Sequence, residues 1–309
     1  MGVNDFGPET TASDVLDGVD LAGRTALVTG VTSGLGGETA RALAAAGATV
    51  ILAARDETAA AAVAERIRGE IPDAAPTTVA LDLADLSSIR DAAERLGTRP
   101  VDLQINNAGV MYTPFARTAD GFELQFGTNH LGHFLLTTLL LPNLQAAADR
   151  SGTASRVVAV SSDAHRAHAV DLADPNFLNR PYDKFVAYAQ SKSANVLATD
   201  ELRNRYDSKG IHAFAVHPGV CATGLSRHMS RDDFAEMKRM SAGKPGLLTD
   251  LKSIPQAAAT SVWAATAPEL AARSGAYLAD CRIDRAAEHA VDPETAAALW
   301  ELSEAFVGR

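Results

Sequence analysis

Short runs of β-branched and aliphatic residues alternate along this chain with longer segments rich in Ala, Leu, Glu and Arg, and no other feature constrains its fold as strongly. Such alternation is typical of βαβ units, which build a parallel sheet covered by helices on both faces. With 309 residues and 47% hydrophobic composition, the chain is long enough to bury one large core. We therefore expect an α/β protein with one domain.

The apolar runs predict seven strands, at residues 25–29, 49–53, 77–81, 103–106, 156–161, 212–216 and 276–279. The intervening segments predict helices at residues 35–46, 57–70, 86–96, 121–148, 187–207, 255–267 and 293–306. Together these elements predict a single doubly wound Rossmann domain with a seven-stranded parallel sheet at residues 21–309. Residues 1–20 read as a polar N-terminal arm.

Residues 224–255 interrupt this alternation and form a less regular insert before the last predicted strand. The insert contains Met229, Met237 and Met240, which are three of the five methionines, together with Phe234. Flexible apolar side chains suit a substrate lid. The alternative is a surface helix pair that packs on the core, because Met often fills gaps.

Charge and cysteine content exclude several classes of protein. The 28 Lys and Arg against 38 Asp and Glu give a formal charge of -10, which argues against a nucleic-acid partner. Two cysteines, Cys221 and Cys281, indicate no disulfide framework and favour a reducing, cytoplasmic location. Residues 1–20 lack the basic and apolar runs of a secretory signal, and polar residues interrupt the most apolar stretch, 131–144, so we expect no membrane association.

A glycine-rich turn follows the first predicted strand. It comprises Gly30, Thr32, Ser33, Gly34, Leu35 and Gly36, and the next helix begins near Gly34. Glycines permit a tight turn and close backbone approach, and a helix N-terminus attracts a phosphate, so this turn predicts a dinucleotide site. The alternative is that these glycines serve only the geometry of the turn.

Arg55 stands at the end of the second predicted strand, where NAD enzymes usually carry a carboxylate for the ribose 2′-hydroxyl. Its guanidinium can face a 2′-phosphate, so NADP(H) is favoured over NAD(H). Arg55 could instead pair with Asp56 or be an exposed strand-end charge. Asp82, beside Leu83 after the third strand, could accept a hydrogen bond from adenine or cap the helix that starts near Asp85.

Tyr188 and Lys192 are spaced i, i+4 near the start of a predicted helix, which puts a phenol and an ammonium on one face. Other motifs follow neighbouring strands or lie in adjacent helices: Asn107, Ala108 and Gly109; Asn129; Ser161 and Ser162; and Pro218, Gly219, Val220 and Thr223. Open α/β sheets bind ligands at the carboxyl ends of their strands. We therefore expect these residues to form one site.

From about residue 21 to the C-terminus the chain resembles the short-chain dehydrogenase/reductase family. The motifs Thr-Gly-x-x-x-Gly-x-Gly, Asn-Asn-Ala-Gly, Ser, Tyr-x-x-x-Lys and Pro-Gly occur in order, and residues 121–134 and 160–165 resemble the branch of retinol dehydrogenases, WW-domain oxidoreductase and protochlorophyllide reductase. The resemblance implies that Asn129, Ser162, Tyr188 and Lys192 are catalytic. It also implies that Val220 and Thr223 contact the nicotinamide side of the cofactor, and that the protein forms a homo-oligomer through its long helices.

The chemistry of these residues can also be argued directly. Reduction of a ketone places negative charge on its oxygen, which must receive a proton, and Tyr188 is the predicted donor. Lys192 and the positive charge of oxidised nicotinamide are expected to lower the pKa of the phenol toward neutrality. Ser162 would hold the carbonyl oxygen, and Asn129 would support a water that passes protons to Lys192. The five histidines at positions 130, 133, 165, 168 and 217 show no ligand spacing, so no metal is expected.

The sequence thus predicts an NADP(H)-dependent enzyme that moves a hydride between nicotinamide and the carbonyl or secondary alcohol of a small lipophilic molecule, with Tyr188 as general acid/base. Two alternatives remain. One is a reductase of carbon–carbon double bonds that uses the same Tyr and Lys. The other is a non-catalytic protein that senses NADP(H).

Overall fold

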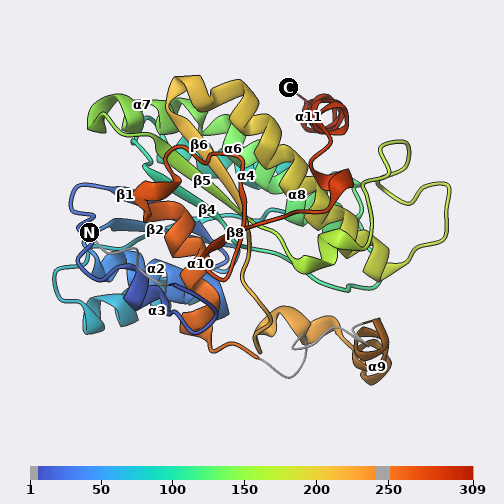
Figure 1. Ribbon diagram of the computed structural model, residues 1–309, viewed down its shortest axis with the longest axis horizontal. Coiled ribbons are helices and arrows are strands. Elements are labelled where there is room, and N and C mark those ends of the chain that lie inside the picture. The colour runs from blue at the N-terminus through green and yellow to red at the C-terminus, as the bar shows by residue number, and fades with distance from the viewer. Residues whose placement is uncertain (1–5, 241–250, 309) are drawn as a thin grey trace.

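The computed structural model describes residues 6–240 and 251–308, and its centre is one mixed sheet (Figure 1). The strands are β1 (Thr25–Thr29), β2 (Thr49–Ala54), β3 (Thr77–Ala80), β4 (Leu103–Asn106), β5 (Ser155–Val160), β6 (Ile211–His217), β7 (Tyr277–Ala279) and β8 (Arg282–Asp284). They lie in the order β3-β2-β1-β4-β5-β6-β7-β8. The predicted Rossmann-like α/β fold is confirmed.

The predicted count of seven strands is wrong by one, because a short edge strand follows β7. Strands β1 to β7 pair in parallel, whereas β8 pairs with β7 antiparallel. The connecting residues Asp280 and Cys281 have φ angles of 51° and 52°. A two-residue hairpin turn requires such left-handed backbone, and it is usually built from Asn-Gly or Asp-Gly. The Asp-Cys pair gives no such signal, so the hairpin could not be read from the sequence.

The helices are α1 (Ala12–Val15), α2 (Gly34–Ala45), α3 (Glu57–Glu70), α4 (Leu86–Leu96), α5 (Leu124–Phe126), α6 (Gly132–Leu139), α7 (Leu141–Ser151), α8 (Lys184–Tyr206), α9 (Arg231–Met240), α10 (Ile254–Thr266) and α11 (Pro293–Val307). The single helix predicted at 121–148 is instead divided. A π-helical turn, η1 (Gly127–Leu131), separates α5 from α6, and Pro142 lies in the first turn of α7. Proline is tolerated at a helix start but interrupts a helix interior, which explains the second break.

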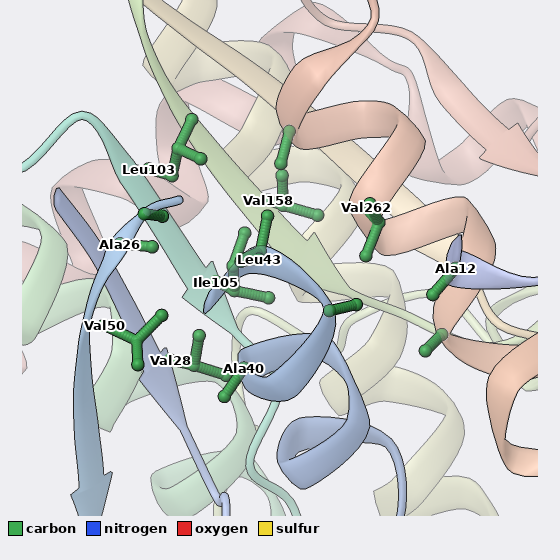
Figure 2. Close-up of a cluster of buried hydrophobic side chains, with 14 of the residues drawn as sticks. Ala12, Ala26, Val28, Ala40, Leu43, Val50, Leu103, Ile105, Val158 and Val262 are labelled. Carbon is green, nitrogen blue, oxygen red and sulfur yellow. The ribbon is translucent and has the colours of Figure 1, made fainter. Parts of the chain in front are cut away.

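Helices cover both faces of the sheet (Figure 1). On one face α2, α3 and α10 pack on the strands, and Figure 2 shows Val28, Ile105 and Val158 of the sheet pointing toward Leu43 of α2 and Val262 of α10. On the other face α4, α6, α8 and α11 bury a second apolar cluster. Alanines such as Ala40 and Ala258 are fully buried, and their small side chains let α2 and α10 approach closely.

The described part of the predicted polar arm, residues 6–20, contains helix α1. Thr11 and Asp14 form a capping box at its start. Ala12 and Val15 are buried in the same apolar cluster as Val262 of α10. This part of the arm therefore packs on the domain.

The order of the strands determines where a ligand-binding crevice can form. The chain runs from β1 outward to β2 and β3, and then crosses over to β4 on the other side of β1. Loops that leave β1 and β4 therefore diverge, and a crevice opens between them at the carboxyl edge of the sheet.

Among the described residues, no helix is both long and apolar enough to cross a membrane.

Candidate active site

A cleft of about 940 Å³ lies at this edge of the sheet. It is lined by most of the predicted site residues: Gly30, Thr32, Ser33, Gly34, Leu35, Arg55, Asp82, Leu83, Asn107, Ala108, Gly109, Ser162, Tyr188, Lys192, Pro218, Gly219, Val220 and Thr223. Two predicted residues, Gly36 and Asn129, do not lie on its wall. The fold thus brings the glycine turn and the Tyr188–Lys192 pair to one cleft.

The glycine turn is shaped by positions where no side chain fits. Gly30 has a φ of 72°, and a Cβ there would lie 2.7 Å from the Cα of Ala108. A Cβ on Gly36 would lie 2.4 Å from the carbonyl oxygen of Gly30. Gly36 therefore supports the turn from behind and does not line the cleft. Ser33 precedes α2 without a side-chain cap, so the first N–H groups of that helix remain open to a phosphate.

The first wall of the cleft has the features that a dinucleotide needs. The Nδ2 of Asn107 donates to the carbonyl oxygen of Thr29 at 2.8 Å, which holds the turn against the end of β4. Thr128 lines the cleft, and its hydroxyl is buried and has no hydrogen-bond partner among the described residues. A buried hydroxyl without a partner is costly, so this one fits a polar ligand atom. No sequence pattern marks Thr128, because a threonine in a predicted helix is ordinary.

Arg55 follows β2 and faces the cleft as an exposed side chain. Asp56 caps helix α3 through a hydrogen bond from the amide of Ala59 at 2.9 Å. No ion pair joins Asp56 to Arg55 in the part of the chain that the structure describes. The guanidinium is therefore available to an anionic ligand group.

Asp82 lines the cleft beyond β3 and does not cap α4. Asp85 provides that cap, since it accepts hydrogen bonds from the amides of Ser87 and Ser88. Asp82 instead accepts from the amide of Ala84 at 2.9 Å, in a local turn. Leu83 lies beside it on the cleft wall.

Tyr188 and Lys192 lie on the second and third turns of α8, which is capped by Asp183 and begins three residues before the predicted start. Both side chains are 4% exposed. The Nζ of Lys192 donates to the carbonyl oxygen of Val160 at 2.9 Å and lies 5.6 Å from the centroid of the Tyr188 ring. The i, i+4 spacing thus produces the expected neighbouring phenol and ammonium.

Burial determines the proton affinities of this pair. Desolvation, followed by the neighbouring Tyr112, raises the pKa of Tyr188 above its ordinary value, while a hydrogen bond with the Ser162 side chain lowers it. Burial also lowers the pKa of Lys192 to about 8. The protein's own groups therefore do not bring the phenol toward neutrality, contrary to the expectation for Lys192. The physical reason is that desolvation disfavours the charged form of both residues.

The two serines after β5 have different partners. The Ser161 hydroxyl donates to the carbonyl oxygen of Lys192 at 2.9 Å and so fastens α8 to the sheet. The Ser162 hydroxyl accepts from the amide of Ala164 at 3.2 Å, and Ser162 lies on the cleft wall with Tyr188, whose pKa it lowers. This geometry favours Ser162 as the serine that faces a substrate.

Asn129 lies in the π-helical turn η1 and is fully buried behind the cleft wall. Its Oδ1 accepts from the amide of Val110 at 2.8 Å. Its Nδ2 donates to the carbonyl oxygen of Val110 at 2.9 Å and to the hydroxyl of Ser191 at 3.0 Å. The side-chain amide is therefore occupied by protein partners and holds the cleft wall, and the role of Asn129 in supporting a water near Lys192 stays a prediction. π-Helical turns are frequent at functional sites.

The far end of the cleft is apolar. Its lining includes Met111, Tyr112, Phe185, Leu225, Met229, Phe234 and Met237. The last four come from η4 (Gly224–His228), from α9 and, for Met229, from the two residues between them, so the described part of the predicted insert faces the cleft. Residues 241–250 lie outside the described residues. The other three were missed by sequence reasoning, although Phe185 stands three residues before Tyr188 on the same helix. The Tyr112 ring lies 4.4 Å from that of Phe185 and 5.2 Å from that of Tyr188.

A family model described as short chain dehydrogenase matches residues 24–233. The chain belongs to this family. Human retinol dehydrogenase 13 is 43% identical over 290 residues, covering 93% of this chain and 86% of the relative. Short-chain dehydrogenase TIC 32 B, chloroplastic, of Brassica napus is 39% identical over 308 residues, covering 98% and 94%. This short-chain dehydrogenase therefore lies in the retinol dehydrogenase-like branch, and the predicted family is confirmed.

Solved structures agree with this family assignment. A crystal structure of an uncharacterised protein from Mycobacterium paratuberculosis has a TM-score of 0.75 and 38% identity, covering 96% of this chain and 97% of that one. The Pseudomonas aeruginosa RhlG/NADP active-site complex has a TM-score of 0.66 and 26% identity, covering 84% and 95%. Short-chain dehydrogenases are oxidoreductases that use a nicotinamide cofactor, and this chain is a member of that enzyme family.

Proposed function

We propose that this short-chain dehydrogenase is an NADP(H)-dependent oxidoreductase that interconverts a carbonyl and a secondary alcohol of a small lipophilic molecule, with Tyr188 as general acid/base. The observation that carries the proposal is the placement of the phenol and the Lys192 ammonium on the wall of the cleft that also contains the glycine turn. Proton donor and cofactor turn thus face the same space.

Tyr188, Ser162 and Lys192 have different roles in the proposed reduction. When bound, NADPH supplies the hydride, and its oxidised form adds a positive charge to the cleft. The Tyr188 hydroxyl gives its proton to the developing alkoxide, and Ser162, which lines the same cleft, orients the same oxygen. The Lys192 cation stabilises the phenolate that remains.

Preference for NADP(H) is supported by Arg55. Its guanidinium lines the cleft at the end of β2, while the only adjacent carboxylate, that of Asp56, is committed to capping α3. A bidentate cation matches a 2′-phosphate, and the position lacks the carboxylate that would bind a free 2′-hydroxyl. A structural neighbour has been solved as an NADP complex, which agrees with this choice of cofactor.

A lipophilic substrate is supported by the methionine and aromatic side chains at the far end of the cleft. Thioether and aromatic groups offer apolar contact that adapts to ligands of different shape. A relative is named as a retinol dehydrogenase, so an apolar alcohol is one substrate of this class to test. A cytoplasmic location is part of the proposal and is supported by two cysteines that are free in the structure.

The proposal is tested with NADPH that carries deuterium at C4 and with an α,β-unsaturated ketone of low polarity. Carbonyl reduction places the deuterium on the carbinol carbon of an allylic alcohol, and mass spectrometry with NMR locates it. Deuterium on a carbon of the former double bond would replace the proposal with the carbon–carbon reductase. Tight NADPH binding without turnover across a panel of aldehydes, ketones and alcohols would replace it with an NADP(H) sensor.

A further inference from the structure

A line of buried polar side chains runs beneath the cleft from the end of β1 to helix α8. Its members are Thr29, His133, Asn129 and Ser191, and none of them is more than 4% exposed. His133 occupies the middle of the line and lies on α6, outside the set of residues assigned above. Buried polar groups at this depth require partners, so the direction of each hydrogen bond can be worked out.

The partners fix the protonation of the His133 ring. The Thr29 hydroxyl accepts from the amides of Asn107 and Ala108, each at 3.0 Å, so it acts as a donor toward its other neighbours, the carbonyl oxygen of Ile105 at 3.4 Å and the nearer His133 ring. The Nε2 of His133 lies 2.9 Å from this hydroxyl, and the Nδ1 lies 3.1 Å from the carbonyl oxygen of Asn129. A carbonyl can only accept. Nδ1 must therefore carry the hydrogen, and Nε2 must accept from Thr29.

The line continues from Asn129 to the catalytic helix. The Nδ2 of Asn129 donates to the hydroxyl of Ser191 at 3.0 Å. That hydroxyl donates in turn to the carbonyl oxygen of Tyr188 at 2.8 Å. Two sets of hydrogen bonds, linked covalently through Asn129, thus join the Thr29 hydroxyl at the end of β1 to the backbone of Tyr188, the residue proposed as acid/base.

We propose that His133 is a positioning residue that fixes the end of β1, where the glycine turn (the nucleotide turn) begins, relative to helix α8, which carries Tyr188. The inference rests on the proposed function, because hydride transfer with proton donation by Tyr188 requires the bound cofactor and the phenol to keep a fixed relative position. An imidazole serves here because one rigid ring offers a donor and an acceptor in opposite directions. The ring must stay neutral to keep its acceptor, and burial, together with the nearby Lys192, lowers the pKa of His133 to about 4.

Two substitutions separate the two ends of the ring. In His133→Asn the amide nitrogen stands the same number of bonds from Cβ as Nδ1, so donation to Asn129 survives and the Thr29 bond is lost. In His133→Gln the amide oxygen stands as far from Cβ as Nε2, so the Thr29 bond survives and the Asn129 bond is lost. Loss of one buried hydrogen bond corresponds to a change of about tenfold.

We expect His133→Asn to raise the Kd for NADPH about tenfold and to leave kcat within about twofold of the wild type. We expect His133→Gln to lower kcat about tenfold and to leave the Kd for NADPH within about twofold of the wild type. The Kd is measured by nicotinamide fluorescence without turnover, and kcat with the ketone used above. Ser303→Ala is the matched control, because it removes another buried hydroxyl–imidazole bond, with His130 at 2.9 Å, away from the cleft. It should lower thermal stability and leave Kd and kcat unchanged.

The outcomes are distinct. Opposite changes of Kd and kcat in the two His133 variants support the proposal. If both variants behave like Ser303→Ala, or if both change Kd and kcat together, His133 has only a structural role and the proposal is wrong. Failure of the proposed function would show as a wild type without turnover, and the Kd comparison would then still test whether His133 holds the nucleotide turn.

Discussion

The two halves of the cleft are built by different means. The half that follows β1 and β4 is made of backbone packed against backbone, so that a Cβ on Gly36 would lie 2.4 Å from the carbonyl oxygen of Gly30. The half that follows β6 is made of flexible apolar side chains, and Phe234 there remains 46% exposed. The first half suits a ligand of constant shape, and the second suits ligands that vary. Substitutions should therefore have larger and more specific effects in the first half.

Within this comparison of the two halves, the largest effect on cofactor binding is expected from Gly36→Ala. The added methyl group would meet the Gly30 carbonyl and the Nδ2 of Asn107, both at 2.4 Å, and neither can move without opening the turn. The Kd for NADPH should rise roughly a hundredfold in fluorescence titration. Gly69→Ala on α3 is the control, because nothing lies within 4 Å of its Cβ. Unchanged NADPH binding in Gly36→Ala would break the comparison, since it would show that the turn tolerates displacement.

Arg55→Asp tests cofactor choice within the same half. Removal of the cation and introduction of a carboxylate should lower the ratio of kcat/KM for NADPH to that for NADH about fiftyfold. Steady-state kinetics with both cofactors measures this ratio. Arg95→Asp makes the same charge change on an exposed residue of α4 outside the cleft and should leave the ratio unaltered. Equal behaviour of the two variants would remove Arg55 from the account.

The pH dependence of reduction reports on Lys192, where the two halves meet. Burial lowers the pKa of this ammonium to about 8, so it loses its charge as the pH rises through that value, while the Tyr188 phenol keeps its proton because its pKa is raised. The kcat/KM for reduction should be level below about pH 8 and fall about tenfold per pH unit above it. A profile that stays level to pH 10 would show that the charge of Lys192 is not required.

The smallest effect is expected in the apolar half. Phe234→Ala should raise KM about threefold for a long-chain ketone and leave KM for a short-chain ketone and Kd for NADPH unchanged, because only part of the ring is buried. Phe115→Ala is a close control, since Phe115 is also 46% exposed and does not line the cleft. An effect of Phe234→Ala on NADPH binding would show that the two halves are not separate.

The same division explains which features the sequence could predict. Strands β1 and β4, helices α3 and α4, the glycine turn and the Tyr188–Lys192 pair were readable, because each depends on a local pattern or a fixed spacing. The π-helical turn at Asn129 and the unpartnered hydroxyl of Thr128 were not. They depend on packing between α6, α8 and the nucleotide turn, and no short motif marks such contacts. Tyr112 likewise joins the cleft through its contact with Phe185, a residue distant in sequence.

The raised pKa of Tyr188 also could not be predicted from the sequence. Spacing alone placed an ammonium near the phenol and suggested that the phenol would become more acidic. Spacing gives no information on solvent exposure, and the structure shows both groups almost completely buried. Desolvation then raises the pKa of Tyr188 above its ordinary value.

The central claim, that the Tyr188 phenol donates the proton, is tested most directly by Tyr188→Phe, which removes one oxygen and keeps the ring. Turnover of the ketone should fall by about a thousandfold or more, as expected for loss of a positioned acid, while Kd for NADPH stays within about threefold of the wild type. Turnover within about tenfold of the wild type, with NADPH still bound, would contradict the account, because the proton would then come from another group.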